Sequence, residues 1–360
     1  MRAPFVWFGG KRRVAPEVWA ALGDVPNYIE PFAGSLAVLL GRPHDMSNGT
    51  RRAETVNDAD GFLANFWRAL AHDPEAVAHW CDWPVNEVDL FARHLWLVNT
   101  GRSRLLEGME ADPDFYDAQV AGWWVWGVNA WIGSGWCSGD GPWVDTGDGI
   151  GKLPHLGDAG QGVNRKLPHL GNAGQGVNRQ LPHLGSAGQG VNRHLGDAGR
   201  AGYNNMEYRP NVLGYFEELA GRLRDVRVCC GDWSRVCTRG AMSSGSRVGV
   251  FLDPPYLGDV RTADLYAVDD HTISHAVRDW CLEHGDDPRL RIVLAGYRAE
   301  HDDLMPDTWR RHYYSASAAY STTESAARQD GNHANRANEV LWFSPHCVTP
   351  DRQGELWEAL

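Results

Sequence analysis

The stretch GVFLDPPYLGD, residues 249–259, decides how the chain folds and where its chemistry should be sought. Val248 and the apolar residues 250–252 predict a short β-strand buried on both faces, as strands inside a parallel sheet are. A proline pair cannot continue a strand ladder. We therefore expect Asp253 to Tyr256 to form a rigid loop at the carboxyl end of that strand, where open α/β sheets bind their ligands.

We expect the other strands at 27–31, 53–57, 226–230, 291–295 and 339–343. Helical patterns follow the first two, at 35–41 and 60–71, which is the βαβ rhythm of a parallel sheet. We expect a later helix to start after an N-cap at Asn211, and another to bury the face formed by Ile273, Ala276, Val277 and Trp280. The sequence thus predicts an α/β protein with a parallel-type sheet, interrupted by a long middle segment at 78–210.

Length and composition limit the class of protein. With 360 residues, 43% of them hydrophobic, the chain can form one large α/β domain and a second, smaller one. It lacks a run of about 18 apolar residues and a signal-peptide core, so we expect a soluble, cytoplasmic protein. The seven cysteines form no CxxC pair and the 15 histidines no HExxH pattern. Neither a disulfide framework nor a metal site is therefore indicated.

The charge balance argues both for and against a nucleic-acid partner. A net charge of -12 opposes phosphate binding, which requires local positive potential. The N-terminal stretch is nevertheless basic, with Arg2, Lys11, Arg12 and Arg13, and residues 151–200 contain six Lys or Arg against two Asp. A basic face on an acidic protein is compatible with this distribution.

The middle segment has two halves of different kinds. Its first half is helical in pattern and rich in tryptophan, at Trp123, Trp124, Trp126, Trp131 and Trp136. Its second half repeats a 14-residue unit, at 152–165, 166–179 and 180–193. Each unit offers few apolar residues, so a flexible insertion that arose by duplication is one interpretation. The other is a set of Gly-rich loops that present polar side chains to a nucleic-acid backbone, and the tryptophans themselves are either helix core or part of such a surface.

Two motifs on the predicted sheet suit a nucleotide-like ligand. IEPFAGS, residues 29–35, runs from a strand into Gly34, where a ligand can approach the backbone closely. VNDAD, residues 56–60, places Asp58 at the end of the next strand, where a carboxylate can accept hydrogen bonds from ribose hydroxyls. The alternative for Asp58 is a helix N-cap, a role that Asp60 could fill equally well.

The tetrad Asp253 to Tyr256 suits the activation of an aromatic amine. Such an amine is a poor nucleophile because its lone pair is delocalised into the ring. Acceptors aimed at its hydrogens return the lone pair to nitrogen; Asp253 supplies a carboxylate and Pro254 a stiffly held carbonyl. Tyr256 supplies a face on which a base can stack.

Taken in order, WFGGKR (7–12), IEPFAGS, NDAD (57–60) and DPPY (253–256) resemble the Dam-type, D12 class DNA adenine-N6 methyltransferases. The resemblance implies a Rossmann-like sheet with an inserted, mainly helical target-recognition domain. The catalytic domain would comprise 1–77 and 211–360, and the inserted region 78–210, including the repeat at 152–193. The cofactor would be S-adenosylmethionine and the partner double-stranded DNA, with the base flipped out of the stack.

The resemblance also assigns roles to single residues. Trp7 and Lys11 would contact the cofactor, Asp58 its ribose, and Phe32 and Gly34 its surroundings, while Asp253 would contact both cofactor and target amine. RANEVLWF (336–343) is similar to the end of the family pattern. GVNAWIGSGWC (127–137) has Ala130 where the recognition region usually has arginine, and the repeat has no counterpart, so the target sequence and any partner nuclease of a restriction–modification system stay open.

Other functions remain as alternatives. The same chemistry on cytosine N4 or on RNA is the nearest, although Asp253 favours adenine because Ser is more usual in the cytosine enzymes. A DNA-binding protein that has lost catalysis is the alternative from another class, and the intact DPPY motif argues against it.

Overall fold

The computed structural model describes residues 1–7, 9–43, 52–131, 136–137, 143–145, 150–152, 208–243, 245–255, 270–314 and 339–349. The chain forms two compact units. Unit 1 comprises Met1–Val6 and Asp60–Cys230, and unit 2 comprises Trp7–Ala59 and Gly231–Leu360. The domain boundaries at 77/78 and 210/211 stay a prediction.

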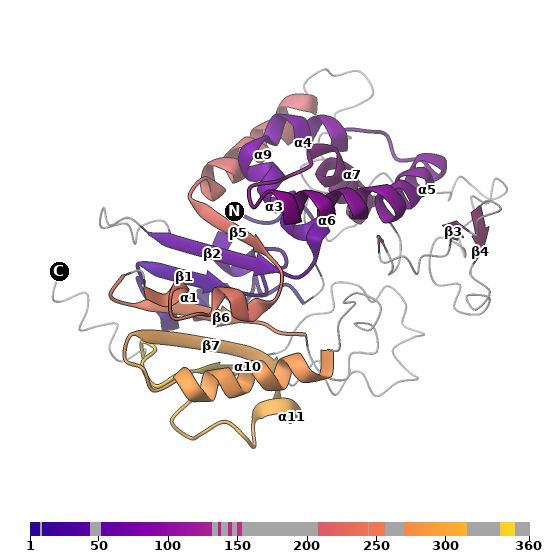
Figure 1. The fold of residues 1–360 in the computed structure, drawn as a ribbon. Coiled ribbons are helices and arrows are strands. Elements are labelled where there is room, and N and C mark those ends of the chain that lie inside the picture. Colours follow the sequence, from indigo (N-terminus) through magenta and orange to yellow (C-terminus); the bar gives the residue numbers. More distant parts are fainter. Residues whose placement is uncertain are drawn as a thin grey trace, which may run out of the picture. The chain divides into compact units, whose positions relative to one another are not determined.

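Six strands of unit 2 form a mixed sheet (Figure 1). In chain order they are β1 (Asn27–Glu30), β2 (Ala53–Asp58), β6 (Val248–Leu252), β7 (Leu290–Tyr297), β8 (Arg310–Tyr314) and β9 (Glu339–Phe343). Their spatial order is β2-β1-β6-β7-β9-β8. β2, β1, β6 and β7 run parallel, whereas β9 runs antiparallel to both β7 and β8. The α/β class expected from the sequence is confirmed, and the sheet is consistent with a methyltransferase fold.

Two features of the sheet differ from the sequence-based expectation. A strand exists at 339–343, but the expectation that it runs parallel to its neighbours was wrong. All five of its residues are buried, and burial along a strand does not indicate the direction in which the strand runs. β8 was not predicted. It lies at the end of the strand order and is only partly buried, so its sequence RRHYY lacks an apolar run.

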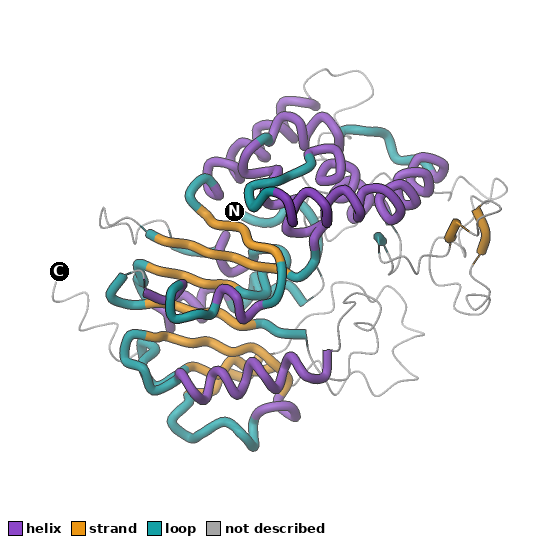
Figure 2. Tube along the Cα trace, in the orientation of Figure 1, coloured by secondary structure: helices purple, strands orange, loops and turns teal. Residues whose placement is uncertain are grey.

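Figure 2 shows the helices of unit 2 as purple tubes beside the orange strands. They are α1 (Ala15–Leu22), α2 (Ala37–Leu40), α10 (Asp270–His284) and α11 (Arg298–His301), with 3-10 turns at Trp233–Val236 and Ala241–Ser243. Trp19 of α1 donates from Nε1 to the Val38 carbonyl at 2.7 Å and packs on Tyr28 of β1. Gly249 of β6 is required there, because a Cβ would lie 2.9 Å from Val25. These contacts fix the positions from which β1 and β6 reach the edge of the sheet.

The buried face of α10 differs from the predicted one. Ser274, Val277 and Cys281 are buried, whereas Ala276 is exposed. Ile273 and Trp280 are only partly buried, so Val277 is the one member of the predicted face that is buried. The expectation failed because the buried stripe includes a serine, which a search for apolar spacing passes over.

Unit 1 is mainly helical in its described part (Figure 1). Its elements are α3 (Gly61–His72), α4 (Pro74–Cys81), α5 (Glu87–Trp96), a π-helical turn (Leu97–Gly101), α6 (Arg102–Ala111), α7 (Ala118–Ala130), β3 (Trp143–Asp145), β4 (Ile150–Lys152), α9 (Tyr208–Leu223) and β5 (Val226–Cys230). Asn211 is therefore inside α9 and not its N-cap, since the helix begins before Pro210, a residue that the first helical turn tolerates. Among the described helices, none is long and apolar enough to cross a membrane.

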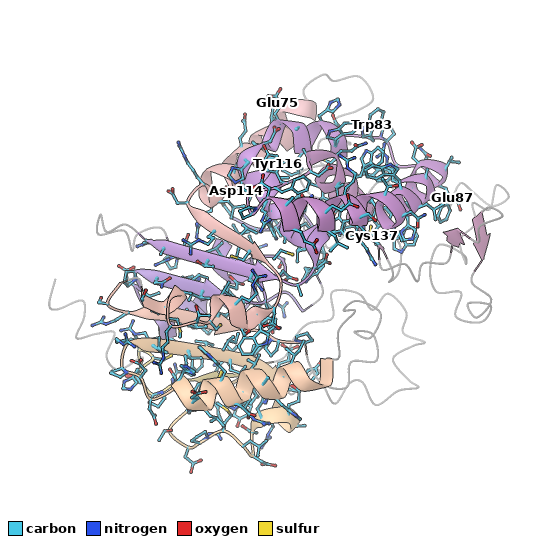
Figure 3. The ribbon with its side chains drawn as sticks, viewed as in Figure 1. Glu75, Trp83, Glu87, Asp114, Tyr116 and Cys137 are labelled. Carbon is cyan, nitrogen blue, oxygen red and sulfur yellow. The ribbon has the colours of Figure 1, made fainter. Side chains whose placement is uncertain are left out.

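Aromatic side chains form the core of unit 1. Phe66 of α3 contacts the rings of Phe5, Trp67, Trp124 and Phe216. Trp126 and Trp131 are buried as well. Trp83 and Tyr116, labelled in Figure 3, belong to the loops that follow α4 and precede α7. The structure therefore favours the interpretation that the buried tryptophans form part of the core between the helices. The tandem repeat lies almost wholly outside the described residues, which include only Lys152 of it.

Candidate active site

The predicted site residues of unit 2 lie at one edge of the sheet, where the central parallel strands have their carboxyl ends. Asp58 is the last residue of β2, and Asp253 directly follows β6. The loop after β1 contains Phe32 and Gly34. Because β2, β1 and β6 are parallel, their carboxyl ends meet at the same edge. Pro254 is buried there beside Asp253, and Tyr256 lies outside the described residues.

Lys11 is held against Asp253. Gly9 adopts a left-handed φ of 73°, which glycine tolerates, and the turn returns the Lys11 side chain to the Gly9 carbonyl, with Nζ donating at 2.8 Å. Lys11 Nζ lies 3.0 Å from Asp253 Oδ1 and 3.9 Å from Glu339 Oε2. Lys11 is only 5% exposed, so these two carboxylates compensate a buried charge. The contact of Lys11 with a cofactor stays a prediction.

Gly34 and Trp7 lie against each other. Gly34 has a φ of 47°, and a Cβ at this position would lie 3.0 Å from Cδ1 and 3.1 Å from Nε1 of Trp7. Leu36 follows with a φ of 54°, an unusual conformation for a leucine. Ala33 donates its N–H to the Asn57 carbonyl at 2.8 Å, which ties this loop to the end of β2. The glycine is therefore required both by the turn and by the indole ring.

Asp58 orders the glycine loop. Its Oδ2 accepts a hydrogen bond from the Gly34 N–H at 2.9 Å, and the side chain is buried. The N-cap of α3 is Asp60, whose carboxylate accepts from the N–H groups of Phe62 and Leu63. The choice that the sequence left open is thus decided, since the helix cap belongs to Asp60. The role of Asp58 toward a ribose remains a prediction.

Trp233 is a candidate site residue that the sequence analysis missed. Its ring stacks near Phe32, with centroids 6.1 Å apart and planes at 28°. Asn57 holds this segment in place, because its Nδ2 donates to the Gly231 carbonyl at 2.9 Å and to the Pro31 carbonyl at 3.0 Å. The sequence did contain a signal for Trp233. A Gly-Asp-Trp triplet directly follows the predicted strand at 226–230, so a glycine and an aromatic residue stand at this strand end, as they do at two other predicted strand ends.

Glu30 gives the site an unusual electrostatic environment. This last residue of β1 is 2% exposed, and its Oε2 accepts hydrogen bonds from the Tyr28 hydroxyl at 3.0 Å and the Leu39 N–H at 3.3 Å. Burial raises the pKa of Glu30 from its ordinary 4.5 to about 8; the two hydrogen bonds oppose this shift, and the charges of Asp253 and Glu54 add to it. Glu30 is therefore mostly neutral at pH 7 and adds little negative charge beside Asp253.

Replacing Glu30 with Gln should flatten the pH dependence of the free energy of unfolding. In the wild type the folded state keeps a proton that the unfolded state releases between pH 4.5 and about 8. The stabilising contribution of protonated Glu30 is therefore complete below pH 4.5 and is lost as the pH rises through about 8. One such proton changes the free energy of unfolding by about 1.4 kcal/mol per pH unit inside this window. Urea unfolding on both sides of the window measures the slope, and equal slopes for variant and wild type would contradict the assignment.

Similarity to a known protein family covers the segment that carries Trp7, Lys11, Phe32, Gly34 and Asp58. No curated protein sequence matches the chain. Asp253 and Trp233 lie outside the matched segment. They belong to unit 2, as do residues 7–59 of the matched segment. Residues 7–85 match the model of the D12 class N6 adenine-specific DNA methyltransferase family, as the motifs predicted.

Proposed function

We propose that this protein transfers a methyl group from S-adenosylmethionine to the N6 amine of adenine in double-stranded DNA. One observation carries the proposal: Asp253 follows a fully buried parallel strand and lies at the same sheet edge as the Asp58–Gly34 loop, with Lys11 3.0 Å from its carboxylate. The match of residues 7–85 to a DNA adenine methyltransferase family supports the reaction and the substrate. The site-specific character and the base flipping are part of the proposal.

The residues of the edge fit the proposed cofactor. Gly34 is only partly buried and has no side chain, so a ligand can approach the backbone of this loop from the side that Trp7 does not cover. The Asp58 carboxylate accepts from Gly34, and a carboxylate can accept several hydrogen bonds, including one from a ribose hydroxyl. Phe32 and Trp233 offer aromatic faces to an adenine ring. S-adenosylmethionine supplies an activated methyl group on a sulfonium.

Asp253 and Pro254 would act on the target amine. The carboxylate and the Pro254 carbonyl accept hydrogen bonds from the two amine hydrogens, which localises the lone pair on nitrogen and points it at the methyl group. The amine nitrogen would take up the methyl group that S-adenosylmethionine supplies and would release one proton to water. Extruding the base from the duplex costs a few kcal/mol, and Tyr256 is the residue on which we expect the extruded base to stack.

Methyl transfer from tritium-labelled S-adenosylmethionine into unmethylated duplex DNA tests this function. We expect label in N6-methyldeoxyadenosine after digestion to nucleosides. RNA and DNA without adenine, offered in parallel, should remain unlabelled. Label in N4-methyldeoxycytidine or in RNA would replace adenine DNA as the substrate, and cofactor binding without any transfer would favour a DNA-binding protein that lacks catalysis.

Deleting residues 152–193 should separate DNA recognition from cofactor binding. We propose that 78–210 form the target-recognition region within a catalytic domain of 1–77 and 211–360. The repeat adds positive charge to an acidic protein, so its loss should weaken DNA binding or alter site choice and leave the affinity for S-adenosylmethionine unchanged. DNA affinity at several salt concentrations and sequencing of methylated sites measure this. Unchanged affinity and unchanged sites would favour an inert insertion.

A further inference from the structure

The reversed direction of β9 brings an additional carboxylate to the active-site edge. β9 starts at Glu339, which pairs with Tyr297, the last residue of β7, and with Tyr314, the last residue of β8. Because β9 runs antiparallel to β7, its first residue lies at the edge where β6 and β7 end. A parallel strand in this position would place its first residue at the opposite edge. The topology thus puts Glu339 at the same edge of the sheet as Asp253.

Lys11 connects Glu339 to Asp253. Its ammonium lies 3.0 Å from Asp253 Oδ1 and 3.9 Å from Glu339 Oε2, and it donates to the Gly9 carbonyl at 2.8 Å. Lys11 and Glu339 are 5% and 6% exposed, so solvent screens their attraction only weakly. An ammonium is a compact charge on a flexible stem with three donors, and its position depends on what surrounds it. The Gly9 carbonyl and Glu339 are thus contacts of the ammonium in addition to Asp253.

We propose that Glu339 is a positioning residue that fixes the Lys11 ammonium and thereby the carboxylate of Asp253. The inference rests on the proposed function, in which Asp253 must present its oxygens to the target amine. Without Glu339, Lys11 has one buried carboxylate partner fewer and a wider range of positions, and the Asp253 carboxylate follows it. A displacement of the order of 1 Å at a reacting group is enough to slow a reaction about 100-fold.

A double-mutant cycle tests whether Glu339 affects methyl transfer through Lys11. Single-turnover methyl transfer at saturating cofactor and DNA is measured for Glu339→Gln, Lys11→Met and the double variant. We expect Glu339→Gln to lower the rate about tenfold or more and to change the dissociation constant of S-adenosylmethionine by less than about threefold. Since Glu339 acts through Lys11, the double variant should be as slow as Lys11→Met alone.

The matched control removes a carboxylate from a comparable pair at the other edge of the sheet. Glu54 Oε1 lies 2.8 Å from Nη1 of the buried Arg42, near the amino end of β2. Glu54→Gln should affect stability and leave the transfer rate of the folded protein unchanged. Equal slowing by Glu54→Gln and Glu339→Gln would overturn the proposal, as would a Glu339→Gln effect that is undiminished in the Lys11→Met background.

A second readout does not depend on activity. Urea unfolding of the wild type, Glu339→Gln, Lys11→Met and the double variant measures the coupling between Lys11 and Glu339 in the free energy of unfolding. We expect the effects of the two substitutions on this free energy to be non-additive. Additive losses would overturn the positioning role even in an active enzyme. A wild type that transfers no methyl group would instead overturn the proposed function, while the unfolding cycle would still decide whether Glu339 holds Lys11.

Discussion

Replacing Asp253 with Asn should slow methyl transfer on the order of 10²–10³-fold, because the site then loses the charged acceptor for the target amine. Asn has nearly the shape of Asp, so the loop at the end of β6 can keep its course. The change also removes the nearer of two carboxylates from the buried Lys11 and leaves Glu339 at 3.9 Å, so stability should fall as well. Single-turnover transfer to duplex DNA measures the rate.

A control for this variant lies at the opposite edge of the same sheet. Asp287 precedes β7 and pairs with Arg289, Oδ2 to Nη2, at 2.7 Å. Asp287→Asn removes one carboxylate from an ion pair, as Asp253→Asn does, and should leave the transfer rate unchanged. Binding of S-adenosylmethionine and DNA is titrated for both variants, so that lost binding is separated from lost transfer. Asp253→Asn protein that transfers within tenfold of the wild-type rate would refute the catalytic role of Asp253.

The central strands could be predicted from sequence because burial leaves a clear local signal. β1, β6 and β9 are completely buried; β6 and β9 contain apolar runs, and β1 has Tyr28 and Ile29 at its centre. β8 has no such signal, since its side chains are largely half-exposed and its sequence is basic and aromatic. The direction of β9 carries no local signal either, because it depends on which strand β9 pairs with.

The site could be predicted only as separate motifs. Periodicity placed Asp58 and Asp253 at strand ends, and the parallel arrangement of β2, β1 and β6 then brings them to one edge. The ion pair of Lys11 with Asp253 joins distant parts of the sequence, and no spacing rule reveals it. Glu30 and Glu339 were missed as site residues because a single acid next to an apolar strand usually marks its solvent end. Their burial is a property of the assembled sheet.

Asp58→Ala should weaken the binding of S-adenosylmethionine about 100-fold, because one carboxylate has two tasks in the proposed site. It holds the glycine loop through the Gly34 N–H and accepts a hydrogen bond from the ribose. Hydrogen bonds to a charged group contribute about 1.5–3 kcal/mol each, which is roughly 10- to 100-fold in affinity. Asp58→Asn keeps an oxygen for Gly34 and should fall between Asp58→Ala and the wild type. Titration calorimetry gives the dissociation constants.

Asp60 provides the matched control, because it is an aspartate two positions further along that caps a helix. Its carboxylate caps α3 through Phe62 and Leu63. Asp60→Ala should therefore lower the free energy of unfolding by about 1 kcal/mol and leave the affinity for S-adenosylmethionine unchanged. If both alanine variants weakened cofactor binding equally, the effect would stem from a general loosening of 56–60. A selective loss in Asp58→Ala, with Asp58→Asn in between, is the outcome that a ribose-binding carboxylate requires.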